Sequence, residues 1–163
     1  MLHLRPITPA DNAAVARVVR TVMPEFGCVG AGYSINDPEL EDMYAAYAQP
    51  RSAFFVLTEA SPAAGVVGVG GYAPLAGGDG TVCELRKMYL LPAARGKGGG
   101  KLLLERCLAG ARADGFASMY LETVASMVTA ARVYEKYGFE PLPAPLGSTG
   151  HGSCDRFMIK SFR

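Results

Sequence analysis

The pattern of apolar and polar residues along the chain predicts short strands separated by helices. Strands are indicated by stretches that alternate apolar and polar residues or are rich in β-branched and aromatic residues. In chain order, these stretches are Leu2 to Pro6, Ala53 to Glu59, Val66 to Tyr72, Val82 to Leu91, Ser118 to Thr123 and Phe157 to Phe162. The second and third are bounded by Ser61-Pro62 and Pro74 and are expected to pair antiparallel. A further short strand near Leu142 is left open.

Helices are indicated by apolar residues that recur three and four positions apart. The apolar stripes of the predicted helices are, in chain order, Val15 to Val22, Leu40 to Tyr47, Leu104 to Ala111 and Met127 to Tyr134. The first helix is expected to begin at the N-cap Thr8 and to end at Pro24, and the second to begin at the N-cap Asp37. Gly115 and Gly138 stand where the last two helices should end.

The resulting order, β-α-α-β-β-β-α-β-α-β, predicts an α/β fold with a mixed sheet. The chain has 163 residues, of which 50% are hydrophobic, and this is enough for one buried core. No internal repeat and no linker divides the sequence. Residues 1–163 are therefore expected to form a single domain.

Charge and hydropathy exclude several kinds of partner. Sixteen lysines and arginines against fifteen acidic residues give a net charge of +1, which provides no bulk attraction for nucleic acid or an anionic membrane surface. No run of about 18 apolar residues predicts a membrane span. The first residues, Met1 to Pro6, lack the long apolar segment of a secretory signal, so we expect a cytoplasmic protein.

Cysteine usage agrees with that compartment. The four cysteines are Cys28, Cys83, Cys107 and Cys154, and they are expected to be reduced thiols. Cys83 and Cys107 lie within apolar patterns and should belong to the core. His151 and Cys154 offer two metal ligands, but a structural zinc site needs four and the sequence has no second pair. We therefore expect no metal.

The strongest chemical signal is the segment Arg95-Gly-Lys-Gly-Gly-Gly-Lys101, between a predicted strand and a predicted helix. Free backbone N–H groups at a helix N-terminus bind anions, and residues without side chains let phosphate oxygens approach the main chain. A Walker A loop is excluded, because Arg95 stands where its first glycine should be and Leu102 follows Lys101. A dinucleotide-binding GxGxxG that begins at Gly96 is excluded too, because it requires glycine at position 101.

What remains is Arg95-x-x-Gly98-x-Gly100 directly after a strand, and here the chain resembles the GNAT superfamily of acyl-CoA-dependent N-acetyltransferases. That family's signature is [Gln/Arg]-x-x-Gly-x-[Gly/Ala] between its fourth strand and its third helix. A second segment, Ala130-Ala-Arg-Val-Tyr-Glu-Lys-Tyr-Gly-Phe139, is similar to the family's Ala-x-x-Leu-Tyr-Glu-Lys-x-Gly-Phe helix. The predicted element order is also the family's, so the resemblance covers nearly the whole chain.

The resemblance implies acetyl-CoA as cosubstrate and no metal. Backbone amides of the glycine loop would hold the pyrophosphate of CoA. The positions concerned are Arg95, Gly96, Lys97, Gly98, Gly99, Gly100 and Lys101. The pantetheine arm would pair with the backbone at Met88, Tyr89 and Leu90, which requires the fourth and fifth strands to splay apart.

The resemblance also assigns the reacting groups. Tyr134 would be the acid that protonates the departing CoA thiolate, although a tyrosine on an apolar stripe also fits a core role. Glu84 would be the base for the amine, directly or through water; an ordinary strand carboxylate is the alternative, and a bulge would change which residues face the slot. Met127 stands where many members carry an asparagine that positions CoA, so that Thr123 or Ser126 would have to replace this contact.

Acceptor specificity in this architecture comes from two loops, here 27–36 and 145–155. Tyr33 in the first loop and His151 in the second are the candidate substrate contacts, although His151 also fits an ordinary hairpin. Asp37 and Glu39 would attract a cationic amine, but Asp37 is already explained as a helix cap.

The long first loop favours an enclosed pocket and a small primary amine, such as an amino acid or a polyamine, as acceptor. The rival acceptor is a protein N-terminus or lysine side chain. Rivals from other classes are a catalytically silent CoA-binding module and, more distantly, a protein that binds another nucleotide. Dimers are common in the family, which leaves a homodimer open. The sequence names neither the acceptor nor the acyl-chain length.

Overall fold

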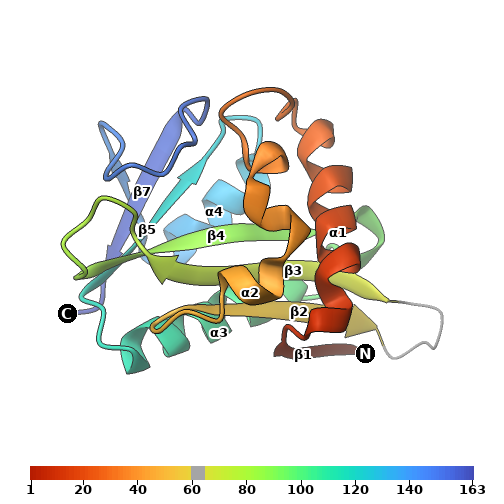
Figure 1. Cartoon of the computed structure of the whole chain (residues 1–163). Coiled ribbons are helices and arrows are strands. Elements are labelled where there is room, and N and C mark those ends of the chain that lie inside the picture. Colours follow the sequence, from red (N-terminus) through yellow and green to blue (C-terminus); the bar gives the residue numbers. More distant parts are fainter. Residues whose placement is uncertain (60–64) are drawn as a thin grey trace.

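The computed structural model describes residues 1–59 and 65–163, and its elements follow the predicted order (Figure 1). The predicted turn at Ser61-Pro62 lies outside the described residues. The strands are β1 (Leu2–Pro6), β2 (Ala53–Glu59), β3 (Val66–Pro74), β4 (Val82–Leu90), β5 (Ser118–Thr123), β6 (Glu140–Leu142) and β7 (Arg156–Ser161). They form one mixed sheet in the order β1-β2-β3-β4-β5-β7-β6. The short β6 is the strand that the sequence left open near Leu142.

Helices cover both faces of this sheet, which confirms the predicted α/β class. The α-helices are α1 (Asn12–Glu25), α2 (Met43–Ala46), α3 (Gly99–Ala113) and α4 (Val128–Lys136). The 3-10 turns are η1 (Pro9–Asp11), η2 (Ser34–Asn36), η3 (Pro38–Glu41) and η4 (Pro92–Ala94). In Figure 1, α1 and α2 lie in front of the sheet, and α3 and α4 lie behind it. The apolar stripes predicted from the sequence are buried on these two faces; Val18 and Val19 of α1 belong to one core cluster and Leu104 of α3 to the other.

The second helix was predicted wrongly as one continuous element. Asp42 interrupts it with φ −149° and ψ 75°, which separates η3 from the four-residue α2. The carboxylate of Asp42 accepts a hydrogen bond from the backbone N–H of Ala45, 3.0 Å away, and so caps the second piece. Leu40, Met43 and Tyr47 are nevertheless buried as the pattern predicted, because both pieces keep the same side toward the sheet.

The first helix begins at the predicted N-cap and differs from its prediction in its first turn and at its end. Thr8 caps the 3-10 turn η1, which leads directly into α1, and its backbone N–H and its hydroxyl both donate to the carboxylate of Asp11. Pro24 does not end the helix, since α1 runs on to Glu25. Proline lacks an N–H to donate, but its own carbonyl still accepts a hydrogen bond from Gly27 in the last turn.

Strands β4 and β5 run parallel and pair only where they begin. Their register extends from Val82 opposite Ser118 to Glu84 opposite Tyr120, and among the described residues no later part of β4 pairs with β5. Beyond this point the two strands diverge, as Figure 1 shows. The predicted splay of the fourth and fifth strands is therefore confirmed.

A bulge in β4 lies beside this opening. The register between β3 and β4 shifts between Val69 and Gly71, and Lys87 adopts a φ of +51°. This left-handed conformation costs a residue with a side chain about 1–2 kcal/mol. The side chain of Lys87 is only 1% exposed, so the bulge brings a charged group into the interior at the point where the strands part.

The sequence predicted reduced cysteines and no membrane span, and the structure bears on both points. All four cysteines are free, and Cys83 and Cys107 are buried in the core. None of the helices in residues 1–59 and 65–163 is both long enough and apolar enough to cross a membrane.

Candidate active site

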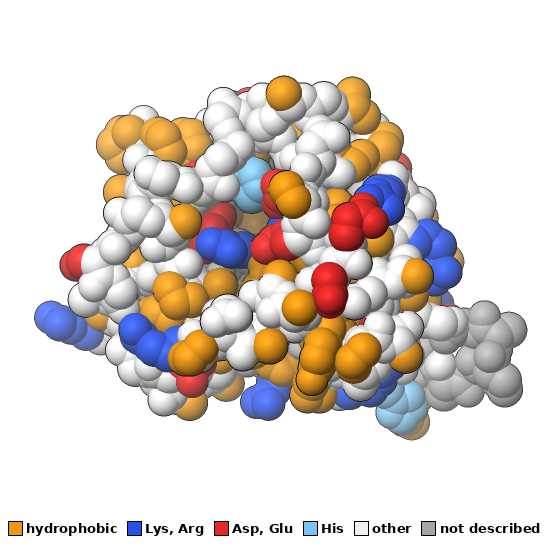
Figure 2. Space-filling model, viewed as in Figure 1, with side chains coloured by type: hydrophobic (Ala, Val, Ile, Leu, Met, Phe, Trp, Pro, Cys, Tyr) orange, Lys and Arg blue, Asp and Glu red, His pale blue; other side chains and the backbone are white. Residues whose placement is uncertain are grey.

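The divergence of β4 and β5 opens a cavity of about 50 Å³ inside the molecule. Six of the residues that the sequence singled out for acetyl transfer line it: Tyr33, Glu84, Met88, Tyr89, Tyr134 and His151. The other candidates, Leu90 and residues 95–101, are not part of its lining. A second cavity of about 230 Å³ shares Arg86 and His151 with the first and is also lined by Asp37, Glu39 and Thr149. Figure 2 shows acidic, basic and histidine side chains gathered in a hollow on this face.

Tyr134 reaches the cavity from α4. Its side chain is buried, and its ring packs edge-on against Phe139 with centroids 5.8 Å apart. Burial raises the pKa of the phenol, because the charged phenolate would be poorly solvated there. The hydroxyl therefore keeps its proton at neutral pH, and this proton is available for donation.

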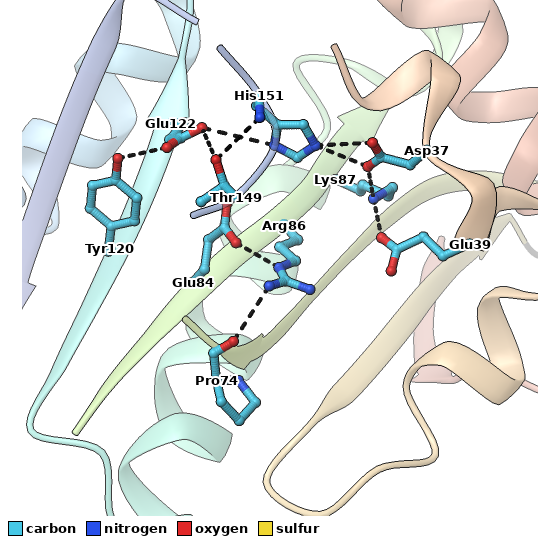
Figure 3. Close-up of polar contacts among 10 residues, drawn as sticks. All are labelled: Asp37, Glu39, Pro74, Glu84, Arg86, Lys87, Tyr120, Glu122, Thr149 and His151. Carbon is cyan, nitrogen blue, oxygen red and sulfur yellow. Dashed lines mark hydrogen bonds and ion pairs between the residues drawn. The ribbon is translucent and has the colours of Figure 1, made fainter. Parts of the chain in front are cut away.

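Glu84 reaches the cavity from β4, in the last residue pair that this strand shares with β5. One of its carboxylate oxygens accepts a hydrogen bond of 2.7 Å from Nε of Arg86 (Figure 3). Burial raises the pKa of Glu84, and the charge of Arg86 opposes this shift without cancelling it. A carboxylate with a raised pKa is a stronger base, so the position suits proton transfer.

Lys87 shows that Asp37 does more than begin a helix. The ammonium group of Lys87 donates to the carboxylate of Asp37 at 2.7 Å and also to that of Glu39. No side-chain capping bond is formed by Asp37, so its predicted role as a helix N-cap is only half right. Its backbone carbonyl does accept a hydrogen bond from Leu40, while its carboxylate faces the site.

His151 joins the same group from the loop before β7. Its Nε2 lies 3.0 Å from Asp37, and its Nδ1 lies 3.9 Å from Oε2 of Glu122 (Figure 3). The hydrogen bond to Asp37 raises the pKa of the imidazole, and burial opposes this shift. An acidic partner therefore holds the ring of His151 in place, whereas a histidine in an ordinary hairpin would need no such partner.

Glu122 is a site residue that our reading of the sequence missed. Its side chain is 3% exposed, and it accepts hydrogen bonds from the hydroxyls of Tyr120 and Thr149 at 2.8 and 2.9 Å. The signal was present, because an acidic residue in the middle of the strand Ser118 to Thr123 breaks an otherwise apolar pattern. Charged residues are almost never fully buried without a specific partner or role.

The two loops expected to define acceptor specificity close over the cavity and touch each other. The hydroxyl of Ser153 donates to the carbonyl of Ala31 at 2.9 Å. A Cβ on Gly32 would lie 2.5 Å from Oγ of Ser153, so only glycine permits this approach. Since Tyr33 and His151 flank this contact in sequence and both line the cavity, the loops enclose the site.

The glycine loop leads from η4 into the N-terminus of α3. The first backbone hydrogen bond of α3 runs from the N–H of Leu102 to the carbonyl of Gly98, so the preceding amides are left for a ligand. Gly96 and Gly98 have φ values of +73° and +81°, and a Cβ at either position would meet nothing within 4 Å. Open space above a free helix N-terminus is the geometry of an anion site.

The other residues of this loop have structural partners as well. Arg95 donates to Glu25 at the end of α1, and Lys97 pairs with Glu59 at 2.8 Å. Gly99 is buried, and a Cβ there would come within 2.8 Å of Leu90, so it also allows α3 to pack closely on the sheet. Lys101, at 3.9 Å from Glu105, makes the loosest of these pairs.

The position of the family's asparagine is occupied differently here. Met127 lines the cavity, and the hydroxyl of Thr123 points to its sulfur at 3.6 Å. The hydroxyl of Ser126 instead donates to the carbonyl of Phe26. Of the two suggested replacements, Thr123 is therefore the one that lines the cavity.

Comparisons with known proteins agree with this geometry. The profile of the Acetyltransferase (GNAT) family matches residues 17–139. The Escherichia coli (strain K12) protein called Uncharacterized N-acetyltransferase YjgM is 44% identical over 158 residues, which cover 96% of this chain and 93% of that protein.

Solved structures show the same fold. A GNAT-family acetyltransferase from Staphylococcus aureus Mu50 superposes with a TM-score of 0.85 at 19% identity and covers all of both chains. An acetyltransferase structure from Salmonella typhimurium, described with its cofactor acetyl-CoA, has a TM-score of 0.77 at 22% identity and covers 100% of this chain and 95% of that one. This chain therefore belongs to the GNAT family and is an acetyl-CoA-dependent N-acetyltransferase.

Proposed function

We propose that the protein transfers the acetyl group of acetyl-CoA to the primary amine of a small molecule, by direct attack within a ternary complex. The observation that carries this proposal is the cavity between β4 and β5, which Tyr134 and Glu84 line together. The contact between the 27–36 and 145–155 loops favours a small acceptor, because it closes the open groove that a protein segment would need.

CoA would enter along the unpaired edge of β4. Its pyrophosphate would bind the free amides of the glycine loop, with Lys97 and Lys101 adding positive charge at the rim. The pantetheine arm would pair with the backbone at Met88, Tyr89 and Leu90, in the place that β5 leaves vacant. The thioester would then lie in the cavity beside Tyr134.

Transfer to an amine makes two demands on the side chains of this cavity. An alkylamine with a pKa of about 10.4 is charged at neutral pH and must lose a proton before it can attack. We assign this proton to Glu84, directly or through water, because burial raises its pKa. The amine nitrogen then bonds to the acyl carbon, the carbon–sulfur bond breaks, and the phenol of Tyr134 gives its proton to the departing thiolate. The second proton of the amine returns to the phenolate.

Turnover of acetyl-CoA against a panel of acceptors tests this proposal. The panel contains amino acids, polyamines and short alkylamines, together with peptides that carry a free N-terminus or a lysine. We expect release of free CoA thiol with members of the small-amine group and none above background with the peptides. Preference for the peptides would replace the small acceptor by a protein, and CoA binding without turnover on any amine would favour the silent CoA-binding module.

A further inference from the structure

Three hydrogen-bond acceptors converge on one point of the cavity wall. One oxygen of Glu84, one oxygen of Glu122 and a ring nitrogen of His151 all lie within 4.8 Å of one another. The three side chains line the same cavity and come from β4, β5 and the loop before β7 (Figure 3). Their spacing leaves room for a small group between them.

In the neutral ring of His151, the nitrogen that faces this point accepts a hydrogen bond. Nε2 lies 3.0–3.1 Å from both oxygens of Asp37, an acceptor-only group, so the ring proton belongs on Nε2. Asp37 is itself held by Lys87 at 2.7 Å. Within the described residues, no donor lies at hydrogen-bond distance from Nδ1, and Oε2 of Glu122 is 3.9 Å from it.

Glu84 also has one carboxylate oxygen that accepts no hydrogen bond from the described residues. Its Oε2 is paired with Arg86, but its Oε1 meets no donor among residues 1–59 and 65–163, although the side chain is only 3% exposed. This oxygen is not among the fully buried side-chain atoms that lack a partner, so water in the cavity can reach it. A ligand with N–H donors would replace that water and occupy the free lone pairs.

The charges of the acidic and basic side chains around the cavity also favour a ligand that donates hydrogen bonds. Arg86 is paired with Glu84, and Lys87 with both Asp37 and Glu39. Glu122 has the uncharged hydroxyls of Tyr120 and Thr149 as its hydrogen-bond donors, and His151, whose Nδ1 is 3.9 Å away, adds no positive charge while its ring is neutral. A buried carboxylate without a matching cation is unfavourable, so a bound cation would complete the group.

The proposed reaction, rather than the spacing of the three acceptors, selects an ammonium group over a metal ion. A tetrahedral nitrogen that donates three hydrogen bonds of about 2.9 Å places its acceptors about 4.7 Å apart. A zinc ion with ligands at about 2.0–2.2 Å requires them to be only about 3.5 Å apart. The three atoms lie within 4.8 Å of one another, an upper bound that admits the ammonium geometry, whereas the 3.9 Å between Nδ1 of His151 and Oε2 of Glu122 is nearer to the metal spacing. The proposed reaction needs an amine at this place, and this selects the ammonium group.

We infer that Glu84, Glu122 and Nδ1 of His151 form a subsite that binds a primary alkylammonium group through its three N–H donors. The inference rests on the proposed transfer to a small amine, and it adds how the acceptor is recognised. A primary ammonium satisfies all three acceptors, whereas a secondary ammonium has two N–H groups and leaves one buried acceptor unpaired. The subsite therefore selects primary amines, and Glu122 and His151 are substrate-binding residues.

Two isomeric cations test the subsite directly. Propylammonium and N-methylethylammonium have the same charge and the same atoms, and differ in the number of N–H donors. We would titrate each into the CoA-saturated protein with ¹⁵N-labelled histidine and follow the ring nitrogens of His151 by NMR, with His151→Asn to assign its signals. We expect propylammonium to shift the Nδ1 resonance and to bind about ten-fold more tightly than its isomer. An unmoved Nδ1 resonance, or equal affinity for both cations, would overturn the inference.

A variant provides an independent readout. Glu122→Gln keeps the shape of the side chain but replaces one acceptor oxygen by a donor, and we expect it to weaken propylammonium binding by about ten-fold. Glu41→Gln is the matched control, since this carboxylate is 77% exposed and does not line either cavity. Equal binding by the two variants would contradict the subsite.

The outcomes separate this inference from the proposed function. If propylammonium binds as described but no amine of the panel is acetylated, the subsite stands and the proposed transfer fails. If small amines are acetylated while Nδ1 of His151 and the Glu122→Gln variant show no response to propylammonium, the transfer stands and the subsite fails.

Discussion

A buried lysine at the centre of the site holds two neighbouring segments together. The side chain of Lys87 is 1% exposed and binds Asp37, just before η3, and Glu39, within η3. Without the ammonium group, the negative charges of these two carboxylates would repel each other with no positive charge from Lys87 between them. Since both are partly exposed, the loss is smaller than for a fully buried pair.

We therefore expect Lys87→Met to lower the free energy of unfolding by about 1–3 kcal/mol. Urea titration measures this directly. Lys101→Met is the control, because its pair with Glu105 is exposed and 3.9 Å long, and its effect should stay below about 0.5 kcal/mol. Equal stabilities of the two variants would show that the buried pair contributes nothing beyond a surface one.

Tyr134 carries the acid role in the proposed mechanism. Tyr134→Phe removes only the hydroxyl and should lower kcat by about ten-fold or more while leaving the affinity for CoA nearly unchanged. Steady-state kinetics and calorimetric titration with CoA separate the two quantities. Tyr44→Phe, at a residue that is 42% exposed, serves as the control. An unchanged kcat in the Tyr134 variant would remove this residue from the chemistry.

The assignment of Glu84 as the base predicts how kcat/KM depends on pH. As a base it must be ionised, and burial raises its pKa, so kcat/KM should fall as the pH drops through that raised value. Glu84→Gln cannot titrate, so the acid limb of the profile should move and the maximal rate should fall by about 100-fold. A variant that keeps the acid limb of the unmodified enzyme would show that another group controls it.

At the scale of elements, the glycine loop links backbone geometry to cosubstrate binding. Gly98 caps α3 in a left-handed conformation, φ +81°, at the end that would hold the pyrophosphate. Gly115, φ +78°, lies just beyond the other end of the same helix. A Cβ would meet nothing within 4 Å at either position, so both substitutions to alanine carry the same backbone strain of about 1 kcal/mol.

We expect Gly98→Ala and Gly115→Ala to lose similar stability, and only Gly98→Ala to weaken CoA binding, by about ten-fold. Thermal unfolding and CoA titration of both variants check this. Equal CoA affinities for the two variants would place the pyrophosphate away from the start of α3.

Regular elements with strong periodicity could be predicted from the sequence, and irregular ones could not. β1 and β2 begin and end where their patterns indicated. The break at Asp42 was missed, because aspartate also fits inside a polar helix face and only the bond to Ala45 shows that it begins a new turn. The bulge at Lys87 was foreseen as a risk in this strand but not located, since a left-handed lysine has no local signature.

At the scale of the whole molecule, the site is assembled from segments far apart in the chain. Motifs within one segment, such as the glycine loop and the helix of Tyr134, could be recognised because their spacing is local. The bond between His151 and Asp37 joins residues 114 positions apart, and that between Lys87 and Asp37 joins residues 50 apart. Neither distance follows from a sequence pattern, which is why the polar group around Glu122 emerged only from the fold.

We propose that residues 1–163 unfold as one domain, because a single sheet runs through both core clusters. Circular dichroism and tyrosine fluorescence should then give the same urea midpoint. Two separated transitions would show that the parts on either side of the β4–β5 opening unfold independently.

The central claim is that CoA lies in the opening between β4 and β5, and a crystal structure of the complex with CoA tests it most directly. The account predicts the pyrophosphate on the backbone amides between Gly98 and Lys101, and the sulfur within about 3.5 Å of the Tyr134 hydroxyl. A pyrophosphate bound elsewhere, or a sulfur out of reach of this hydroxyl, would contradict it.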